Sequence, residues 1–412
     1  MLIGLFVLAL GGLAGFYFYL HTQSQEMPAS GVSPRTAVGA PSFGSPTGST
    51  QANQAIATQS LGTSGSQSTS TSALWQADKA PVAGMGFVNT DAGEKIYFIE
   101  RANGYVFGAD PAARAVIRIT DTLMPKIAVA QFANNGYFIE QTIDASGAIA
   151  TFLGHVASSS ATSTGATTVS NVQGQLSEVA GNYIEPDIRA IALDRVTRSL
   201  FYLISDPHGG VAGISMEWNG LKRHQAFASI IGSWRPFALD DGSIVLLESP
   251  ADGVPGYAYS LSSGGSLRAL VQNVPGLTIL PKSGSSSLIF GSSSGSGLSL
   301  FARSTGAPTA TPFQTTADKC VWLPGASQIV YCAIPNGTIS GKYLNAHYKG
   351  IGATSDDWWR LDLTTGATQR IYSPSADNVS LDVENPIMDE SGNYISFLNA
   401  YDHSLWVLRV SQ

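Results

Sequence analysis

Residues 388–397 read Met-Asp-Glu-Ser-Gly-Asn-Tyr-Ile-Ser-Phe, a polar turn that runs into a short apolar strand. Gly, Asn, Asp and Ser are typical of such turns because they tolerate positive φ or hydrogen-bond to their own backbone. The same turn-to-strand pattern occurs seven times after residue 80. The apolar runs begin at Ile96, Tyr137, Leu200, Ile244, Leu288, Ile329 and Ile395.

The spacing of these runs indicates the architecture. Successive starts differ by 41, 63, 44, 44, 41 and 66 residues. One strand-rich unit about every 40 residues is typical of a four-stranded propeller blade. Each long interval holds an insertion, a Ser/Thr-rich stretch at 157–168 and a second segment at 335–356. No segment after residue 80 shows a sustained helical apolar period. The sequence therefore predicts an all-β, seven-bladed β-propeller over residues 74–412.

The last repeat unit has three visible strands before Gln412. The segment at 74–80 precedes the first unit and is predicted to supply the fourth strand. Such pairing would join the two ends of the ring and remove exposed strand edges.

The N-terminal segment predicts a membrane anchor. Residues 1–20 contain no charged side chain, and a helix of that length spans roughly 30 Å, the thickness of a bilayer core. The alternative is a cleaved signal peptide, which needs a basic start and a small-residue cleavage site. No Lys or Arg precedes the apolar run, and the best small-residue site, Gly12-Leu13-Ala14, lies inside it. We therefore expect an uncleaved single-pass anchor over residues 1–22.

Residues 23–73 are predicted to form a flexible linker. They are rich in Ser, Thr, Gly, Ala, Gln and Pro and carry two charges, Glu26 and Arg35. Such a composition buries too little apolar area to offset the entropy of ordering. As a random coil, about 50 residues reach roughly 40 Å. With the N-terminus inside the cell, the propeller is expected on the extracytoplasmic side of the cell membrane.

The two cysteines agree with that location. Cys320 and Cys332 flank a turn at 324–327. If Leu323 pairs with Ile329, the same register places the cysteines opposite each other, near the short end of the disulfide range. A disulfide indicates an oxidising compartment. The alternative is two free, buried cysteines on neighbouring strands.

Composition excludes several classes of function. Charged residues make up 12% of the chain and the net charge is −7, without the clustered Lys and Arg of a nucleic-acid interface. We find no zinc-ligand spacing and no nucleophile elbow in a strand–turn–helix context. We therefore assign no catalytic residue, metal site or cofactor. Catalysis would need side chains from distant blades to converge at the channel mouth, and the candidates are Asp240, Asp241, His208, Arg235, His347 and Asp357.

The second insertion is the strongest candidate for binding. It lies between the second and third strands of its unit, at the propeller face that also carries the links between blades. Aromatic side chains suit recognition because they bury a large area with few rotatable bonds. The alternative is that these aromatic side chains fold down as a lid over the channel. The candidate residues are Tyr343, Asn345, His347, Tyr348, Lys349, Asp356, Asp357 and Trp358.

Two segments resemble known propellers. Residues 385–397, with a Pro followed by an Asp and Gly turn and an apolar strand, resemble the WD40-like repeat of TolB-type propellers. Residues 356–366 together with 402–408 resemble a group of membrane-anchored propeller proteins of candidate-phyla-radiation bacteria. The resemblance implies a protein-binding propeller and carries over no catalytic residue.

These observations lead to one functional expectation. We expect a membrane-tethered binding or scaffolding propeller that recognises a protein or glycan at the cell envelope. The alternative is an envelope hydrolase or lyase with a catalytic site at the mouth of the propeller channel.

Overall fold

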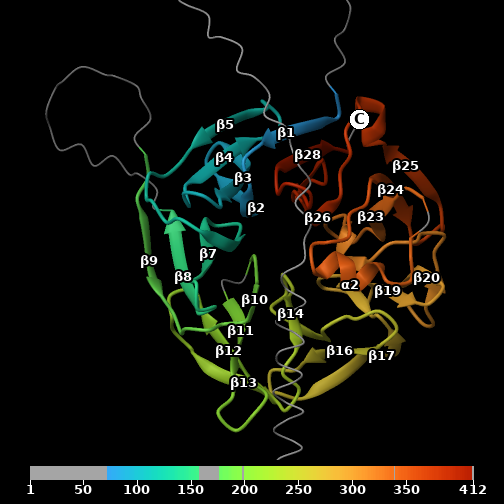
Figure 1. Ribbon diagram of the computed structural model, residues 1–412, viewed down its shortest axis with the longest axis horizontal. Helices are drawn as coiled ribbons and strands as arrows, with labels where there is room; N and C mark the ends of the chain where they lie inside the picture. Colours follow the sequence, from blue (N-terminus) through green and yellow to red (C-terminus); the bar gives the residue numbers. More distant parts are fainter. Residues whose placement is uncertain (1–71, 157–175, 197–198, 338, 411–412) are drawn as a thin grey trace, which may run out of the picture. The chain divides into compact units, whose positions relative to one another are not determined.

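Seven four-stranded antiparallel sheets form the blades of a propeller around a central axis (Figure 1). The computed structural model describes residues 72–156, 176–196, 199–337 and 339–410. The predicted all-β, seven-bladed architecture is confirmed.

The first four blades follow the chain from inner to outer strand. Blade 1 holds β2 (Val82–Thr90), β3 (Gly93–Glu100), β4 (Val106–Asp110) and β5 (Ala115–Arg118). Blade 2 holds β6 (Ile127–Phe132), β7 (Tyr137–Ile143), β8 (Ile149–Val156) and β9 (Val179–Tyr183). Blade 3 holds β10 (Ala190–Leu193), β11 (Ser199–Ser205), β12 (Val211–Glu217) and β13 (His224–Ser229). Blade 4 holds β14 (Trp234–Ala238), β15 (Ile244–Glu248), β16 (Pro255–Leu261) and β17 (Leu267–Pro275).

The remaining blades include three short helices and the strand from the start of the domain. Blade 5 holds β18 (Thr278–Pro281), β19 (Leu288–Ser294), β20 (Gly297–Arg303) and β21 (Thr309–Ala310). After the 3-10 helix η1 (Ala317–Lys319), blade 6 holds β22 (Cys320–Trp322), β23 (Ile329–Pro335), β24 (Asp356–Asp362) and β25 (Thr368–Tyr372), with α2 (Tyr343–Tyr348) between β23 and β24. After the 3-10 helix η2 (Pro374–Asp377), blade 7 holds β26 (Val383–Met388), β27 (Tyr394–Asn399), β28 (Leu405–Arg409) and β1 (Leu74–Asp78).

The antiparallel order gives the propeller two distinct faces. The turns from second to third strand and the links from one blade to the next lie at one end, which we call the α2 face. The turns from first to second and from third to fourth strand lie at the other, which we call the opposite face. Because β1 pairs antiparallel with β28, the chain enters β1 at the opposite face.

A left-handed glycine marks the turn between the first and second strands. Such a backbone conformation costs glycine least because it has no Cβ. This glycine is the recurring element of the repeat that the sequence predicted. It occurs in six blades, with φ between 63° and 92°, at Gly93, Gly136, Gly242, Gly284, Gly325 and Gly392.

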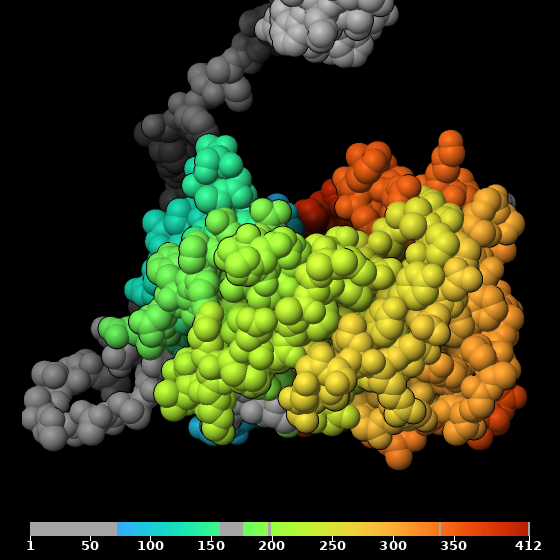
Figure 2. Space-filling model, turned by 90° about the horizontal axis from the view of Figure 1, so that it is seen from below, coloured from blue at the N-terminus to red at the C-terminus, as the bar shows by residue number. Residues whose placement is uncertain are grey.

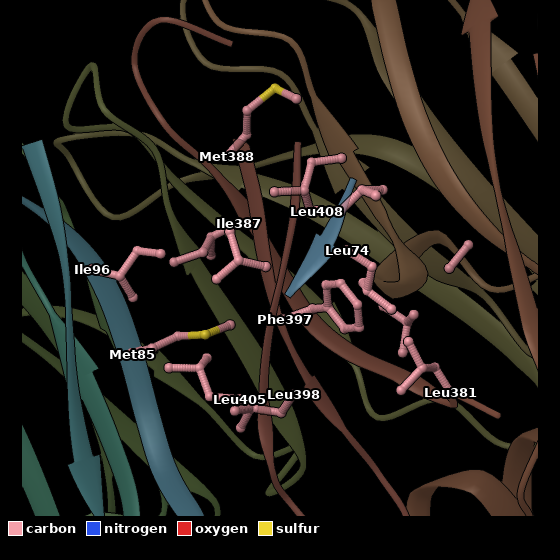
Figure 3. Packing of buried hydrophobic residues seen from close by; sticks show 14 of the residues in the cluster. Leu74, Met85, Ile96, Leu381, Ile387, Met388, Phe397, Leu398, Leu405 and Leu408 are labelled. Carbon is pink, nitrogen blue, oxygen red and sulfur yellow. The ribbon is translucent and has the colours of Figure 1, made fainter. Parts of the chain in front are cut away.

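The ring closes through β1, as predicted. Leu74 pairs with Leu408, and the Arg409 amide donates to the Ala73 carbonyl at 2.9 Å. Leu74 is 6% exposed and lies in one apolar cluster with Phe397 and Leu408 (Figure 3). The cluster reaches into blade 1 through residues such as Ile96. The N-terminal strand is therefore part of the core that joins blade 7 to blade 1.

Neighbouring inner strands approach very closely between blades 1 and 2. A Cβ on Gly84 would lie 1.8 Å from the Ala130 carbonyl oxygen, and one on Gly86 would lie 2.5 Å from the Phe132 Cβ. Glycine at both positions of β2 lets it pack against β6.

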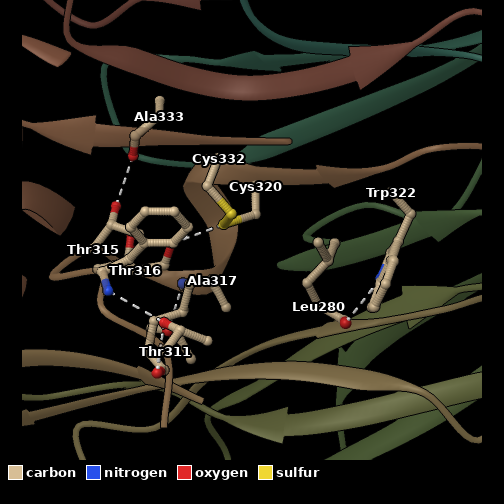
Figure 4. The surroundings of a disulfide bond; sticks show 12 residues. Leu280, Thr311, Thr315, Thr316, Ala317, Cys320, Trp322, Cys332 and Ala333 are labelled. Carbon is tan, nitrogen blue, oxygen red and sulfur yellow. Dashed lines mark hydrogen bonds between the residues drawn. A yellow bond between two sulfur atoms is a disulfide. The ribbon is translucent and has the colours of Figure 1, made fainter. Parts of the chain in front are cut away.

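The two cysteines form a disulfide, as the hairpin register predicted. Cys320 pairs with Cys332 across β22 and β23, and their Cα atoms lie 4.0 Å apart. The bridge is buried beside Thr315 and Thr316 (Figure 4). The Thr315 hydroxyl donates to the Ala333 carbonyl at 2.8 Å.

Three sequence-based expectations lie partly or wholly outside the described residues. These are the predicted anchor at 1–22, the linker up to residue 71 and the Ser/Thr-rich insertion at 157–168. Within the part that the structure describes, no helix has the length and apolar character needed to cross a membrane.

Helix α2 was not predicted. Its six residues are too few to show an apolar period or to be stable alone, so its stability comes from tertiary contacts.

The closure predicts a stability effect at Leu74. We expect Leu74→Ala to lower the free energy of unfolding by about 2 to 4 kcal/mol, because it leaves a cavity in the cluster that joins the ends of the chain. Chemical denaturation would measure the change. The matched substitution Leu123→Ala affects a side chain that is 63% exposed and is expected to cost less than about 0.5 kcal/mol. Equal effects of the two substitutions would contradict the closure.

A buried carboxyl predicts a pH effect on stability. Glu140 in β7 is 1% exposed and shares its strand face with Phe138, in the core between blades 1 and 2. Its Oε2 has no hydrogen-bond partner among the described residues. Burial raises the pKa of the Glu140 carboxyl to about 8, from a usual value of 4.5. The folded protein therefore keeps this carboxyl protonated at neutral pH.

The sign of this effect follows from linkage. Between pH 4.5 and 8 the unfolded carboxyl is ionised while the folded one is protonated. The free energy of unfolding therefore falls by about 3 to 5 kcal/mol across this range. We expect Glu140→Gln to remove that decline, so that its melting temperature exceeds that of the parent protein at pH 9 more than at pH 5. The exposed Glu178→Gln is the control, and parallel pH profiles for parent and Glu140→Gln would refute the prediction.

Candidate functional site

The insertion of blade 6 folds over the inner strands instead of extending outward. It leaves β23 at Pro335, forms α2 and enters β24 at Asp356. In Figure 1, α2 lies in front of the blades, toward the centre of the ring. In the space-filling view, atoms coloured for residues near 350 rise above the neighbouring surface (Figure 2). The insertion is thus a raised part of the α2 face.

A carboxylate from blade 4 holds the start of α2. The amides of Leu344 and Asn345 donate to the Asp252 carboxylate at 3.2 and 2.9 Å. The Asn345 side-chain oxygen accepts from the Asp252 amide at 3.1 Å, and Ser293 of blade 5 donates to the same carboxylate. These contacts satisfy amides that are unpaired at a helix start. They connect α2 to blades 4 and 5.

A buried ion cluster lies beneath α2. The Lys319 ammonium donates to Asp356 at 2.6 Å, to Asp382 at 2.5 Å and to the Thr354 hydroxyl at 2.8 Å. Both carboxylates are fully buried, and the lysine side chain is 1% exposed. All three lysine protons are used. The cluster joins the start of blade 6 to the start of blade 7, and the Tyr343 ring centroid lies 6.0 Å from the ammonium.

Lys319 and Tyr343 both stay protonated near neutral pH. Burial alone lowers the pKa of Lys319, but its electrostatic interactions with Asp356, Tyr343 and Asp382 outweigh burial and raise that pKa. Burial raises the pKa of Tyr343 to about 12, against the opposing effect of Lys319. Neither the ammonium nor the phenol is therefore available as a base near neutral pH.

The end of α2 is held by a second set of contacts. The Tyr348 hydroxyl donates to Asp318 at 2.6 Å, and the Arg235 guanidinium of blade 4 lies 4.7 Å from the Tyr348 ring centroid. Burial acts to raise the pKa of Asp318, but Arg235 and His347 outweigh it and lower that pKa. Burial and Asp318 raise the pKa of Tyr348 well above its usual range. Asp318 is thus ionised and Tyr348 is neutral.

The structure separates the predicted binding residues into two groups. Asn345 and Lys349 are exposed, and His347 and Tyr348 are half-buried. The remaining four are buried and hold the insertion or the blade in place. These are Tyr343, Asp356, Asp357 and Trp358.

Three of the buried residues lie in β24, and the contacts of Asp357 and Trp358 fix this strand within blade 6 and against blade 7. Asp357 accepts hydrogen bonds from Asn336 and Ser373 at 3.1 and 2.7 Å and pairs with Arg370 at 3.2 Å. Trp358 is fully buried, and its ring centroid lies 5.4 Å from the ring centroid of Phe397 in blade 7. The sequence placed them beside the loop but contained no signal that their strand positions are buried.

The candidate catalytic residues do not gather at one site. Arg235 and His347 both contact Tyr348 at the α2 face. Asp240 and Asp241 follow the other end of β14, at the opposite face. His208 lies in the β11–β12 turn and Asp357 in the blade 6 contacts described above. Asp318, His347 and Tyr348 do come together at the α2 face, where Asp318 and Tyr348 are hydrogen-bonded to each other.

A groove of about 530 Å³ lies beside α2. Blade 4 contributes residues 252–253, blade 5 contributes Gly295, and the insertion contributes residues between 341 and 351. In contrast to the clusters under α2, this groove is open to solvent.

The residues that position α2 were largely missed from sequence. Lys319, Asp382 and Asp252 are isolated charges in three different links or loops. Their spacing along the chain matches no motif, and only the fold brings them together. Among the described residues, no group of three or more His, Cys, Asp or Glu side chains is arranged to hold a metal ion.

Comparisons with known proteins give the fold alone. No protein-family model and no curated protein sequence matches the chain. YCF48 from Cyanidioschyzon merolae is similar over 82% of this chain and 98% of its own, with a TM-score of 0.51 and 10% identity. The β-propeller domain of the trilobed protease from Pyrococcus furiosus is similar over 81% and 98%, with a TM-score of 0.50 and 9% identity.

Another similar structure is an oligogalacturonate lyase from Vibrio parahaemolyticus. The aligned part makes up 81% of this chain and 91% of the lyase chain, with a TM-score of 0.49 and 8% identity. At these identities the comparisons support the β-propeller fold, whose seven blades the structure shows, and no specific activity.

The ion cluster predicts a large difference between two buried lysines. We expect Lys319→Met to lower the free energy of unfolding by about 3 to 5 kcal/mol, because two buried carboxylates lose their counter-charge. The control Lys282→Met also removes a buried lysine, but one bonded to the Leu323 carbonyl and placed over Trp322. It is expected to cost about 1 to 2 kcal/mol. Urea unfolding would measure both, and a smaller loss for Lys319→Met than for Lys282→Met would contradict the assignment.

Proposed function

We propose that this chain is a membrane-tethered, extracytoplasmic binding propeller that recognises a partner at the cell envelope through its α2 face. The observation that carries the proposal is the distribution of exposed apolar side chains. Among the residues that the structure describes, loops and links of the α2 face hold six of them, whereas turns of the opposite face hold Val196 and Leu221. The six are Leu123, Ile230, Ile231, Val254, Ile351 and Tyr401.

Covering exposed apolar side chains removes them from water and stabilises a complex. The end of the fold that carries more of them is therefore favoured as an interaction surface. The α2 insertion is held by contacts to blades 4, 5 and 6, so its surface is ordered before a partner arrives. Such pre-organisation lowers the entropic cost of association.

The direction of the chain supports tethering. The chain enters β1 at the opposite face, so the proposed linker of residues 23–73 would join the propeller on the side away from α2. The α2 face is then free of the attachment point. The disulfide between Cys320 and Cys332 supports an oxidising, extracytoplasmic location.

The catalytic alternative has weaker support. It needs titratable side chains poised near neutral pH in a shared, accessible site. The carboxylates that converge beneath α2 are engaged by Lys319 and by Tyr348, and both tyrosines are neutral and buried or half-buried. The likeness to lyase and peptidase propellers extends to the fold alone.

Proximity labelling on intact cells tests the binding function. We expect the full chain to label a dominant envelope partner. The double substitution Leu123→Asp with Ile230→Asp should reduce that labelling at least about fivefold, a loss of about 1 kcal/mol in binding. Both side chains are highly exposed, at 63% and 94%, so folding is retained.

The matched control lies on the opposite face. Val196→Asp with Leu221→Asp introduces the same charge at side chains that are 50% and 62% exposed, and labelling should persist. Equal loss from both pairs would argue against the α2 face. Deletion of residues 1–22 should release the protein from the membrane fraction, and retention there would argue against the anchor.

A further inference from the structure

The groove beside α2 has an open floor and an apolar wall. Gly253, Gly295 and Gly341 place no side chain into it. Ala346 and Ile351 contribute apolar surface, and Ile351 is 77% exposed. A large exposed apolar side chain beside a concave surface is a suitable anchor point for a ligand.

Two cations flank the same groove. Lys342 and Lys349 line it, and both are exposed. Among the described residues, neither lysine has a carboxylate within ion-pairing distance. The one acidic residue of the lining, Asp252, is already engaged by the amides of α2 and by Ser293. The groove therefore carries two cations that form no ion pair and one carboxylate that is hydrogen-bonded to the start of α2.

The spacing of the two lysines defines a ligand pattern. They are seven residues apart at the two ends of α2, which corresponds to about 10 Å along a helix. A peptide in the extended polyproline II conformation rises about 3.1 Å per residue with three residues per turn, so every third side chain lies on the same face. Acidic side chains three residues apart on such a segment would therefore match Lys342 and Lys349.

The lining favours a peptide over a glycan. Sugar rings present apolar faces that aromatic side chains cover well, but no aromatic side chain lines this groove in the part of the chain that is described. The nearby Tyr343 and Tyr348 are directed toward Lys319 and Asp318 instead. An aliphatic anchor between two ammonium groups suits an acidic segment with interspersed apolar residues.

We propose that this groove binds an extended acidic segment of a partner protein. Its carboxylates pair with Lys342 and Lys349, and an apolar side chain between them packs on Ile351 and Ala346. This inference rests on the proposed binding function and names the chemistry of the partner. The contacts of α2 with Asp252 and Asp318 keep the two lysines at a fixed separation.

Fluorescence anisotropy with defined peptides tests the site. The probe is a labelled peptide of repeated Glu-Leu-Ser units, which repeats its carboxylates every third residue, titrated with the full chain. We expect the peptide to bind the parent chain. In the double variant Lys342→Glu with Lys349→Glu its affinity should fall at least about tenfold, which corresponds to 1.4 kcal/mol of binding free energy. The same peptide with Gln in place of Glu should not bind.

The control variant changes the net charge equally at a distance from the groove. Lys79→Glu with Arg268→Glu replaces two exposed cations of blades 7 and 4, and affinity should stay within about twofold of the parent because long-range charge effects are screened by salt. Circular dichroism would verify that both double variants are folded.

Three outcomes would overturn the inference. The acidic peptide fails to bind the parent chain, or it binds both double variants equally, or an oligogalacturonate binds more tightly and loses affinity in the Lys342→Glu, Lys349→Glu variant. The last result would assign the groove to an acidic glycan. Labelling of the partner on cells separates this inference from the proposed function. If labelling persists in the Lys342→Glu, Lys349→Glu variant but is lost in Leu123→Asp with Ile230→Asp, the groove is rejected as the site and the proposed function is retained.

Discussion

The pairing of β1 with β28 is the contact on which the whole propeller depends. A ring of sheets has no single hydrophobic centre, because each blade buries its faces against two neighbours. Without β1, blade 7 would expose the edge of β28, and the cluster around Leu74 and Phe397 would lose one wall. Unpaired edges invite association with other chains. Closure between the two ends of the domain therefore protects every blade interface.

The buried Lys319 cluster is a second constraint, and it determines what the α2 face presents. Its carboxylates come from β24 and from the link into blade 7, so one ammonium ties together three segments. Buried ion pairs contribute little net stability over apolar packing, but removing one partner is costly. The cluster consequently specifies one position of the insertion. The Asp252 and Tyr348 contacts then fix the two ends of α2.

Much of the fold was predictable because it is local and repeated. The turn glycines, the short apolar strands and the spacing of about 40 residues are features of neighbouring residues. The register of Cys320 with Cys332 followed from one tight hairpin. The burial of Asp356, Asp357 and Trp358 did not follow, since it depends on blade 7 and on β25 packing against their strand. Helix α2 was missed because its contacts come from blades 4 and 5.

The sequence by itself predicted the number of blades, the ring closure, the opposed positions of the two cysteines and the place of the insertion. Each of these depends on periodicity or on short-range pairing, which a linear pattern records. Only the tertiary structure decided which side chains of the insertion face solvent, because burial is a property of what packs on a residue from distant blades. Tyr343 and Tyr348 thus turned inward, and Lys342, Asn345, Lys349 and Ile351 became the surface. The reason is that Lys319, Asp318 and Asp252 meet α2 only where blades 4 to 6 pack side by side in the folded propeller.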